Sequence, residues 1–356
     1  MGVLGSIGQR ARHVAGWFTQ PLLPDDLLGT LNPMWSRREP HARVVGVRRE
    51  TADTTTLLLQ PGPSHPEHVA GQFVGVGLRI DGVWQWRTYS VTSAPGDRLL
   101  AVTVTALPGG TVSGALAHRT PVGALLRIGP PAGEFVLPNP VPEKLLFLTA
   151  GSGITPVMSM LRDLAGRSES LSGAVLVHCD RTPADLVFGP ELRALAAATG
   201  LTLIERHTAL EGRLTPETLT DVVPDWTARQ TWACGPTAML DALTEHWARA
   251  GDPDALHLER FVPPTPVADG LTGGRVSFTT SGISADAGPG TPLMAAGEAA
   301  GALLPNGCRM GICHTCVGKL RSGAIRNLHT GDLTDTPGLA VRTCVSGAAG
   351  DVEIEL

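Results

Sequence analysis

The sequence reads CRMGICHTC at residues 308–316, and this stretch decides the fold of the C-terminal part of the chain. Its cysteines follow the spacing C-x4-C-x2-C, and a fourth follows after 27 intervening residues: Cys308, Cys313, Cys316 and Cys344. Four thiolates in this spacing can hold a [2Fe–2S] cluster. Gly307 and Gly311 let backbone N–H groups approach the cluster sulfurs, and such hydrogen bonds tune the reduction potential. We therefore predict an iron–sulfur cluster here.

Other uses of these cysteines fit less well. A structural zinc site usually pairs two short C-x2-C knuckles, and only one is present. Haem attachment through C-x-x-C-H fails because Val317 follows Cys316. A Rieske-type centre would need two histidines in ligand positions, whereas all four positions are cysteine and His314 lies between two of them.

The composition limits the classes of protein that the chain can represent. With 356 residues it is long enough for two or three domains. A formal net charge of −5 argues against a nucleic-acid partner, whose phosphates would call for a basic face. No apolar run reaches the ~18–20 residues that span a bilayer, and no signal peptide is evident. We therefore expect a cytoplasmic protein, which also suits cysteines used for metal ligation.

Outward from the cluster, the pattern predicts a multidomain protein. Residues 275–356 form a small mixed α+β segment, and residues 263–274, rich in Pro and Gly, resemble a linker. Residues 139–262 alternate apolar strands with helical stretches, which predicts an α/β domain with a parallel sheet. Residues 41–138 contain short alternating runs separated by Gly, Pro and Asp turns, which predicts a small antiparallel β-barrel.

Residues 1–40 read as an N-terminal extension. Arg10, Arg12 and His13 precede Trp17, Phe18 and a Pro-punctuated stretch. One interpretation is a segment that packs on the surface of the barrel. The other is docking to a partner or a membrane surface, since Trp and Leu beside Arg suit an interface.

A flavin site is indicated in the barrel region. Arg87-Thr88-Tyr89-Ser90 ends a strand and offers a cation for phosphate, an aromatic face and a small donor near flavin N5. Tyr89 is the only tyrosine in the chain. The segment Gly109–Ser113 can bring backbone N–H groups and a hydroxyl to a phosphate at a helix start. Gly129–Phe135 is a tight turn that could close the far side.

A nucleotide site is indicated in the α/β region. The run Leu146–Ala150 leads into Gly151-Ser152-Gly153-Ile154-Thr155-Pro156, where Thr155 suits an N-cap and Pro156 the first helical position. Glycines before a helix N-terminus permit close approach of a pyrophosphate. Cys234-Gly235-Pro236 also follows a strand and precedes a helix, so both loops belong to the sheet edge where open α/β sheets bind ligands. The alternative for Cys234 is a small buried hydrophobe.

Taken together, these motifs resemble the ferredoxin–NADP⁺ reductase superfamily over residues 41–356, in the variant with a C-terminal plant-type ferredoxin domain. The motifs follow the family's order: RTYS, GGTVS, GPPAGEF, TAGSGITP, ACGP, LERF and the cysteine cluster. The resemblance implies a flavin-binding barrel, an NAD(P)-binding α/β domain and a β-grasp ferredoxin domain. It also implies FAD rather than FMN, a [2Fe–2S] cluster and NADPH or NADH as cofactors.

The resemblance also assigns roles. Arg87 and Thr88 would bind the flavin with Gly110, Val112 and Ser113, Tyr89 would pack on its ring, and Ser90 would hydrogen-bond N5. The residues expected to bind the nucleotide are Thr149, Gly151, Ser152, Gly153, Thr155, Pro156, Cys234, Gly235 and Pro236. Cys234 would lie near the hydride-donating carbon, and Glu259 and Phe261 near the flavin–nicotinamide contact. Arg181 and Arg206 stand where the superfamily can hold a 2′-phosphate, which favours NADPH. The alternative is that either is a solvated surface arginine.

The expected reaction is hydride transfer from NAD(P)H to the flavin, then one-electron steps through the cluster to an acceptor protein. The extension QPLLPDDLLGTLNPMWS is similar to that of reductases serving membrane di-iron fatty-acid desaturases, which implies such a partner and peripheral contact with it. Close relatives serve Rieske-type oxygenases and other hydroxylases. The rivals are a reductase of ferric iron or oxygen and a non-catalytic redox-sensing protein.

Overall fold

The computed structural model describes part of the chain. The described residues are 29–80, 83–167, 170–261, 272–306, 311, 315–328 and 330–356. Cys308, Cys313, residues 1–28 and most of the expected linker lie outside them. The chain forms two compact units, Met1–Leu78 with Tyr89–Gly212, and Arg79–Thr88 with Arg213–Leu356.

The barrel is built from six antiparallel strands in the order β4-β3-β6-β1-β2-β5. Their bounds are β1 His41–Arg49, β2 Thr54–Pro61, β3 Phe73–Ile80, β4 Val83–Ser90, β5 Leu100–Thr105 and β6 Leu125–Ile128, with helix α3 at Thr111–His118. Alternation places Ala42 and Val44 of β1 and Leu57 and Leu59 of β2 in the core. The short 3₁₀ helix η1, Pro33–Trp35, contacts β1, so the described end of the extension lies on the barrel.

The α/β region contains five strands in the order β11-β10-β7-β8-β9. The strands are β7 Leu145–Ala150, β8 Ala174–Asp180, β9 Thr202–His207, β10 Gln230–Cys234 and β11 Leu256–Glu259. The helices are α4 Ile154–Gly166, α5 Gly189–Thr199, α6 Thr208–Glu211, α7 Pro216–Val222 and α8 Thr237–Ala250, with 3₁₀ turns η2 Gly151–Gly153, η3 Trp226–Ala228 and η4 Pro253–Ala255. The pairs β7–β8, β8–β9 and β10–β11 are parallel, as the alternation of strands and helices predicts.

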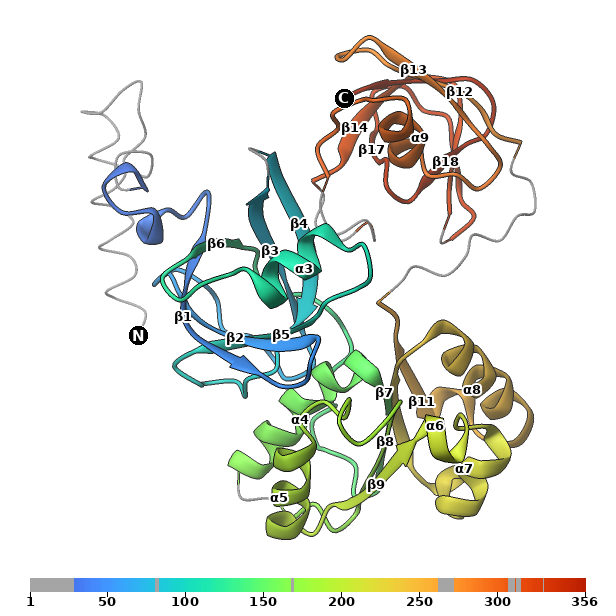
Figure 1. The fold of residues 1–356 in the computed structure, drawn as a ribbon. Coiled ribbons are helices and arrows are strands. Elements are labelled where there is room, and N and C mark those ends of the chain that lie inside the picture. The colour runs from blue at the N-terminus through green and yellow to red at the C-terminus, as the bar shows by residue number, and fades with distance from the viewer. Residues whose placement is uncertain are drawn as a thin grey trace. The chain divides into compact units, whose positions relative to one another are not determined.

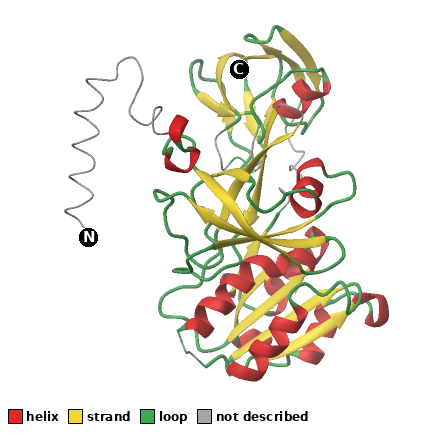
Figure 2. Cartoon of the chain, turned by 60° about the vertical axis from the view of Figure 1, so that its left-hand side comes forward, coloured by secondary structure: helices red, strands yellow, loops and turns green. Residues whose placement is uncertain are grey.

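The C-terminal domain has the β-grasp arrangement. Its main sheet has the order β13-β12-β19-β14-β17, and β16-β15-β18 form a second small sheet. The bounds are β12 Gly274–Phe278, β13 Ile283–Ala287, α9 Leu293–Ala299, β14 Val317–Ser322, β15 Ile325–Asn327, β16 Leu333–Thr334, β17 Ala340–Arg342, β18 Ser346–Ala348 and β19 Val352–Glu355. Helix α9 packs on β12 and β13, and strands dominate the domain that carries the C-terminus (Figures 1 and 2).

Apolar burial between α9 and the strands stabilises this small domain. Val276, Phe278 and Leu293 are almost fully buried in one core with Leu320 and Ile354. Gly297 on α9 faces the Phe278 ring so closely that a Cβ there would lie 2.5 Å from a ring carbon. A larger residue at 297 would therefore push the helix off the sheet.

No helix in the described part of the chain is both long and apolar enough to cross a bilayer.

Candidate flavin, nucleotide and cluster sites

The predicted flavin strand ends with a buried hydroxyl that has no partner. Ser90 is the last residue of β4, is 4% exposed, and its Oγ makes no hydrogen bond with any described residue. A buried hydroxyl without a partner costs free energy, so a bound group is expected to satisfy it. Tyr89 is half-buried beside it. This orphaned donor fits a flavin whose N5 faces the end of β4.

The other unit holds the preceding residues Arg87 and Thr88, both half-buried. Nη1 of Arg87 donates to the carbonyl of Trp86 at 2.7 Å, which helps to orient the guanidinium. The role of Arg87 as a phosphate ligand remains a prediction.

The GGTVS segment starts a helix, as predicted. Gly110 is the N-cap of α3, and Val112 and Ser113 lie in its first turn. A Cβ at Gly110 would lie 2.4 Å from Oγ of Ser113, so a larger residue would require this hydroxyl to move. The Ser113 hydroxyl accepts a hydrogen bond from the backbone N–H of Leu107 at 3.1 Å. The unpaired N–H groups of this first turn suit an anion, while Ser113 mainly shapes the loop.

The nucleotide loop differs from the prediction in where its helix begins. The 3₁₀ turn η2, Gly151–Gly153, runs directly into α4, whose N-cap is Gly153 and whose first residue is Ile154. Thr155 is therefore not the N-cap, and its hydroxyl donates to the Ser152 carbonyl at 2.8 Å. Pro156 is the third helical residue, where its missing N–H costs nothing because first-turn N–H groups have no partner within the helix. Gly151 has φ +54 and open space beside its Cα, as a close ligand approach requires.

Behind this loop lies a buried pair that sequence reasoning missed. Thr149 and His178 face each other on β7 and β8, both are 0% exposed, and the Thr149 hydroxyl lies 2.9 Å from Nδ1 of His178. Burial lowers the pKa of His178 to about 4, so the ring is neutral. Nε2 has no partner among the described residues. The signal was a histidine inside the apolar run AVLVHCD. The Thr149 hydroxyl therefore links β7 to β8 through His178, and its nucleotide contact remains a prediction.

Both arginines proposed for a 2′-phosphate have protein partners. Arg181 pairs with Asp185 through Nε at 3.2 Å, and its side chain is 74% exposed. Arg206 donates to the carbonyls of Gly212 at 2.9 Å and Glu211 at 2.6 Å. Arg181 can turn to a ligand at little cost because an exposed pair is weak. Arg206 would have to leave the carbonyl groups at the end of α6.

Asp180, the last residue of β8, is a second residue that sequence reasoning missed. Burial raises its pKa to about 6, and Oδ2 has no partner among the described residues. Its Oδ1 accepts from the backbone N–H of Arg181 at 2.9 Å. A carboxyl at the carboxyl end of a parallel strand can accept a hydrogen bond from a ribose hydroxyl.

The second nucleotide loop carries a thiol and a carboxyl in register. Cys234 ends β10, Glu259 ends β11, and the two are partners in the parallel pairing. Burial raises the pKa of both, and Glu259 adds to the effect on Cys234 by charge. The pKa of Glu259 rises to about 8, so both groups are neutral at pH 7. Gly235 and Pro236 lead into α8, as predicted, and Phe261 follows β11 with 39% of its surface exposed.

Two of the four predicted cluster ligands are described, and both are buried. Cys316 is 1% exposed and Cys344 5%, while Cys308 and Cys313 lie outside the described residues. Thr343 links the two segments, since its N–H and hydroxyl donate to the Cys316 carbonyl at 3.2 and 2.9 Å. The chemistry of four thiolates fits a [2Fe–2S] cluster. Within the described part no group of three or more His, Cys, Asp and Glu side chains could hold a metal ion.

Arg342 ties the cluster loop to the strand before Cys344. Its Nη1 donates to the carbonyl of Gly311 at 2.6 Å. Gly311 has φ +76, and a Cβ there would lie 2.9 Å from Cγ2 of Val345. The loop therefore needs glycine at 311, and Arg342 places a positive charge beside it.

Comparison with known families gives three matches along the chain. Residues 42–137 match the oxidoreductase FAD-binding domain, residues 147–245 the oxidoreductase NAD-binding domain, and residues 278–348 the 2Fe-2S iron-sulfur cluster binding domain.

Individual proteins match over almost the whole chain. An NADPH oxidoreductase of Mycobacterium tuberculosis is 48% identical over 97% of this chain and 92% of its own length. The glycine betaine monooxygenase reductase subunit of Pseudomonas aeruginosa is 31% identical over 91% of this chain and 98% of its own. The structure of phthalate dioxygenase reductase superposes with a TM-score of 0.62 at 22% identity, covering 89% of this chain and 97% of that one. The last match supports the fold alone.

Proposed function

We propose that this chain delivers electrons to a partner oxygenase. The chain belongs to the ferredoxin–NADP⁺ reductase superfamily and is an NAD(P)H-dependent oxidoreductase with FAD-binding, NAD-binding and [2Fe–2S] domains. The observation that carries the proposal is the presence of all three domains in one chain. Bound FAD can exchange both a hydride and single electrons, whereas a [2Fe–2S] cluster carries single electrons. A reductase of small acceptors would not need the third domain.

The residues of the chain would bind and orient the reactants. The unpartnered hydroxyl of Ser90 would hold the flavin edge, and the loop Gly151–Gly153 with the first turn of α4 would hold the pyrophosphate. Cys234 and Glu259, both neutral, would present an uncharged surface to the nicotinamide. These roles belong to positioning, and no residue is assigned to acid–base catalysis.

The identity of the acceptor rests on the relatives. The Pseudomonas relative is named as the reductase subunit of a glycine betaine monooxygenase, and a 30% identical Mycobacterium tuberculosis protein is named the ferredoxin reductase component of a 3-ketosteroid-9-alpha-monooxygenase. These names support a hydroxylating oxygenase as the partner. The fatty-acid desaturase expected from residues 20–36 finds no support among the relatives named here and remains a prediction.

We propose NADPH as the preferred reductant. The 48% identical relative is named an NADPH oxidoreductase, and Arg181 offers an exposed guanidinium at the end of β8.

An anaerobic titration tests both proposals. The purified protein is titrated with NADPH and, in parallel, with NADH, while the visible spectrum is followed. Loss of both flavin and iron–sulfur absorbance at low nucleotide excess supports electron flow from the nucleotide through the flavin to the cluster. The nucleotide with the lower dissociation constant is the preferred reductant. A flavin that neither nucleotide reduces would exclude the reductase and favour redox sensing.

A second experiment identifies the class of acceptor. The reduced protein is mixed with a purified Rieske-type oxygenase and, separately, with a di-iron desaturase in phospholipid vesicles. Faster oxidation of the reductase by the Rieske protein supports the oxygenase proposal, whereas oxidation only by the desaturase supports the partner expected from the N-terminal extension.

A further inference from the structure

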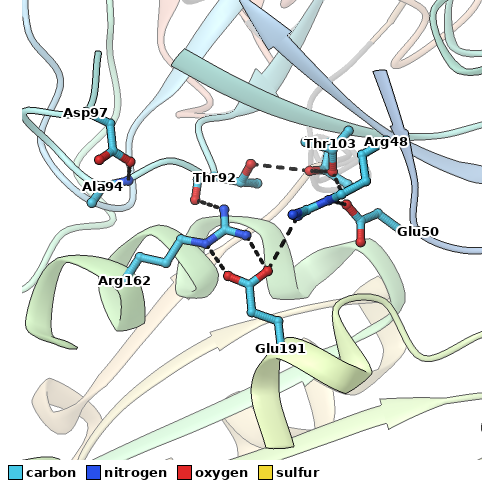
Figure 3. A network of polar contacts seen from close by, with 9 residues as sticks. Arg48, Glu50, Thr92, Ala94, Asp97, Thr103, Arg162 and Glu191 are labelled. Atoms are coloured by element: carbon cyan, nitrogen blue, oxygen red, sulfur yellow. Dashed lines mark hydrogen bonds and ion pairs between the residues drawn. The ribbon is translucent and has the colours of Figure 1, made fainter. Parts of the chain in front are cut away.

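One arginine joins the helix after the nucleotide loop to the backbone that follows the flavin strand. Arg162 lies on α4, and its Nη1 donates to the carbonyl of Thr92, two residues beyond Ser90 (Figure 3). Its Nε and Nη2 donate to the two carboxylate oxygens of Glu191, both at 2.8 Å. The guanidinium thus uses its planar fork on one carboxylate and a third donor on the barrel backbone.

Glu191 is in turn held by the barrel. It lies in the first turn of α5, and Nη2 of Arg48 on β1 lies 3.5 Å from its Oε2. The other end of the Arg48 guanidinium bonds Glu50 at 2.7 Å, and Glu50 accepts from the Thr56 hydroxyl at 2.6 Å. The network therefore connects β1 and β2 of the barrel with α4 and α5 (Figure 3).

The centre of the network is shielded from solvent, while Arg48 at its edge is 51% exposed. The Arg162 side chain is only 17% exposed, and its guanidinium carbon lies 5.1 Å from the centre of the Phe188 ring. Phe188 is buried with φ +59 at the N-cap of α5, a conformation that a bulky residue adopts only where its surroundings enforce it. Burial alone would raise the pKa of Glu191, but hydrogen bonds and charge from Arg162 and Arg48 outweigh it and lower the pKa.

A second attachment lies one turn earlier on α4. The Ser159 hydroxyl donates to the carbonyl of Ser93 at 2.7 Å, and Nε2 of His68 lies 3.1 Å from the same oxygen. Two consecutive carbonyls, of Thr92 and Ser93, are therefore bonded by residues three positions apart on one helix. Two bonds a turn apart fix the rotation of the helix as well as its distance from the barrel.

We propose that Arg162 is a positioning residue for hydride transfer, which it supports by fixing the nucleotide loop relative to the flavin strand. Thr92 is two residues from Ser90, at most about 7 Å along the chain. Arg162 is eight residues from Ile154, about 12 Å along α4. Since α4 is stiff over this length and Thr92 lies two residues beyond the end of β4, a shift at the fork displaces the nicotinamide relative to the flavin. The inference rests on the proposed hydride transfer and names a residue outside both binding loops.

The alternative is that Arg162 merely stabilises the fold. Arg193→Met is the matched control. Arg193 lies on α5, the helix that carries Glu191, and also forms a fork with a carboxylate, that of Glu205 on β9, at 2.7 and 2.8 Å. That pair lies wholly within the nucleotide region. Both variants lose a forked ion pair, but only Arg162→Met also removes a bond between α4 and the barrel, leaving the Ser159 bond to Ser93.

The test uses the full holoprotein under anaerobic stopped flow. We expect Arg162→Met to lower the limiting rate of flavin reduction at saturating NADPH by roughly 10- to 100-fold, since a displacement near 1 Å can cost that much. NADP⁺ should bind with its dissociation constant within about twofold, because the loop itself is intact. The long-wavelength charge-transfer absorbance, which reports nicotinamide stacked on flavin, should weaken. Arg193→Met should leave both readouts near wild type.

Each outcome of this test either supports or overturns the inference about Arg162. A wild-type limiting rate and charge-transfer band in Arg162→Met would overturn the inference, as would an equal loss in Arg193→Met. If Arg162→Met does not retain flavin, Glu191→Gln and Arg162→Lys decide by the same two readouts, and wild-type behaviour in both overturns it. Failure of NADPH to reduce the wild-type flavin would instead overturn the proposed function.

Discussion

Among single residues, Ser90 carries the most direct prediction about the flavin. Its hydroxyl is buried and has no partner within the described chain. We expect Ser90→Ala to keep bound flavin but to lower the limiting rate of flavin reduction by ~10- to 100-fold, because one hydrogen bond to a reacting group is worth about 1.5–3 kcal/mol. Stopped-flow reduction by NADPH measures this. An unchanged rate with an unchanged flavin spectrum would show that the hydroxyl does not face the flavin.

Glu259 gives a prediction about pH and stability. Burial raises its pKa to about 8 in the folded protein, against an ordinary value of 4.5. The folded state therefore binds more protons between these values, and stability falls as the pH rises through this window. Glu259→Gln cannot ionise. We therefore expect its free energy of unfolding, relative to that of wild type, to rise by about 3 kcal/mol as the pH is raised from 5 to 8.

Urea unfolding of the nucleotide-free protein at both pH values measures the Glu259 effect. Glu245→Gln on α8, whose side chain is 75% exposed, is the control and should show little change with pH. A stability difference between Glu259→Gln and wild type that stays constant with pH would contradict the neutral carboxyl.

At the level of elements, the buried histidine of β8 should have the opposite pH dependence. Burial lowers the pKa of His178 to about 4 from 6.5, so the unfolded state binds more protons between these values. The contribution of His178 to stability is complete above pH 6.5 and is lost as the pH falls toward 4. We expect His178→Asn to reduce the loss of unfolding free energy between pH 7 and pH 5 by about 2 kcal/mol.

The same urea series checks the His178 prediction. Asn can replace Nδ1 toward Thr149 without ionising, so the variant should remain folded. His118→Asn, at an exposed histidine of α3, is the control. Equal acid losses in wild type and His178→Asn would mean that the ring is charged in the folded protein.

The strand before Cys344 yields a prediction about the cluster. Arg342 donates to the carbonyl of Gly311 in the cluster loop. A nearby positive charge favours the reduced, more negative cluster, so we expect Arg342→Gln to lower its midpoint potential by on the order of tens of millivolts. An electron paramagnetic resonance titration measures it. Arg326→Gln, which loses a similar bond to the Gly331 carbonyl, should leave the potential unchanged. An equal shift in both variants would exclude a local effect of Arg342.

Elements were more predictable than the contacts between them. The short alternating runs expected within residues 41–138 are present as strands β1 to β6, because alternation with a period of two reports directly which face is buried. The predicted start of α4 was wrong by two residues, because the 3₁₀ turn η2 continues into the helix without a side-chain cap. His178, Asp180 and the Arg162 fork could not be foreseen, because they depend on which segments the fold brings side by side.

For the whole molecule, the family and the three cofactors could be read from the order of motifs along the chain. Their order corresponds to the three family matches. The acceptor could not be read in the same way. A protein docks through a surface rather than a short motif, so residues 20–36 suggested a desaturase without any chemistry that distinguishes it from a hydroxylating oxygenase.

The last prediction concerns the electron route through the whole chain. We expect Cys308→Ser to reduce cytochrome c at least about tenfold more slowly than wild type, because a one-electron protein acceptor needs the thiolate-held cluster. The rate of ferricyanide reduction should remain mostly intact, because ferricyanide is reduced directly at the flavin. Steady-state assays with NADPH measure both. Cys179→Ser is the control, since Cys179 is a buried cysteine of β8 outside the cluster motif, and both of its rates should stay near wild type. If Cys308→Ser slows both acceptors equally, electrons do not leave through the C-terminal domain alone, and the order of carriers proposed here is wrong.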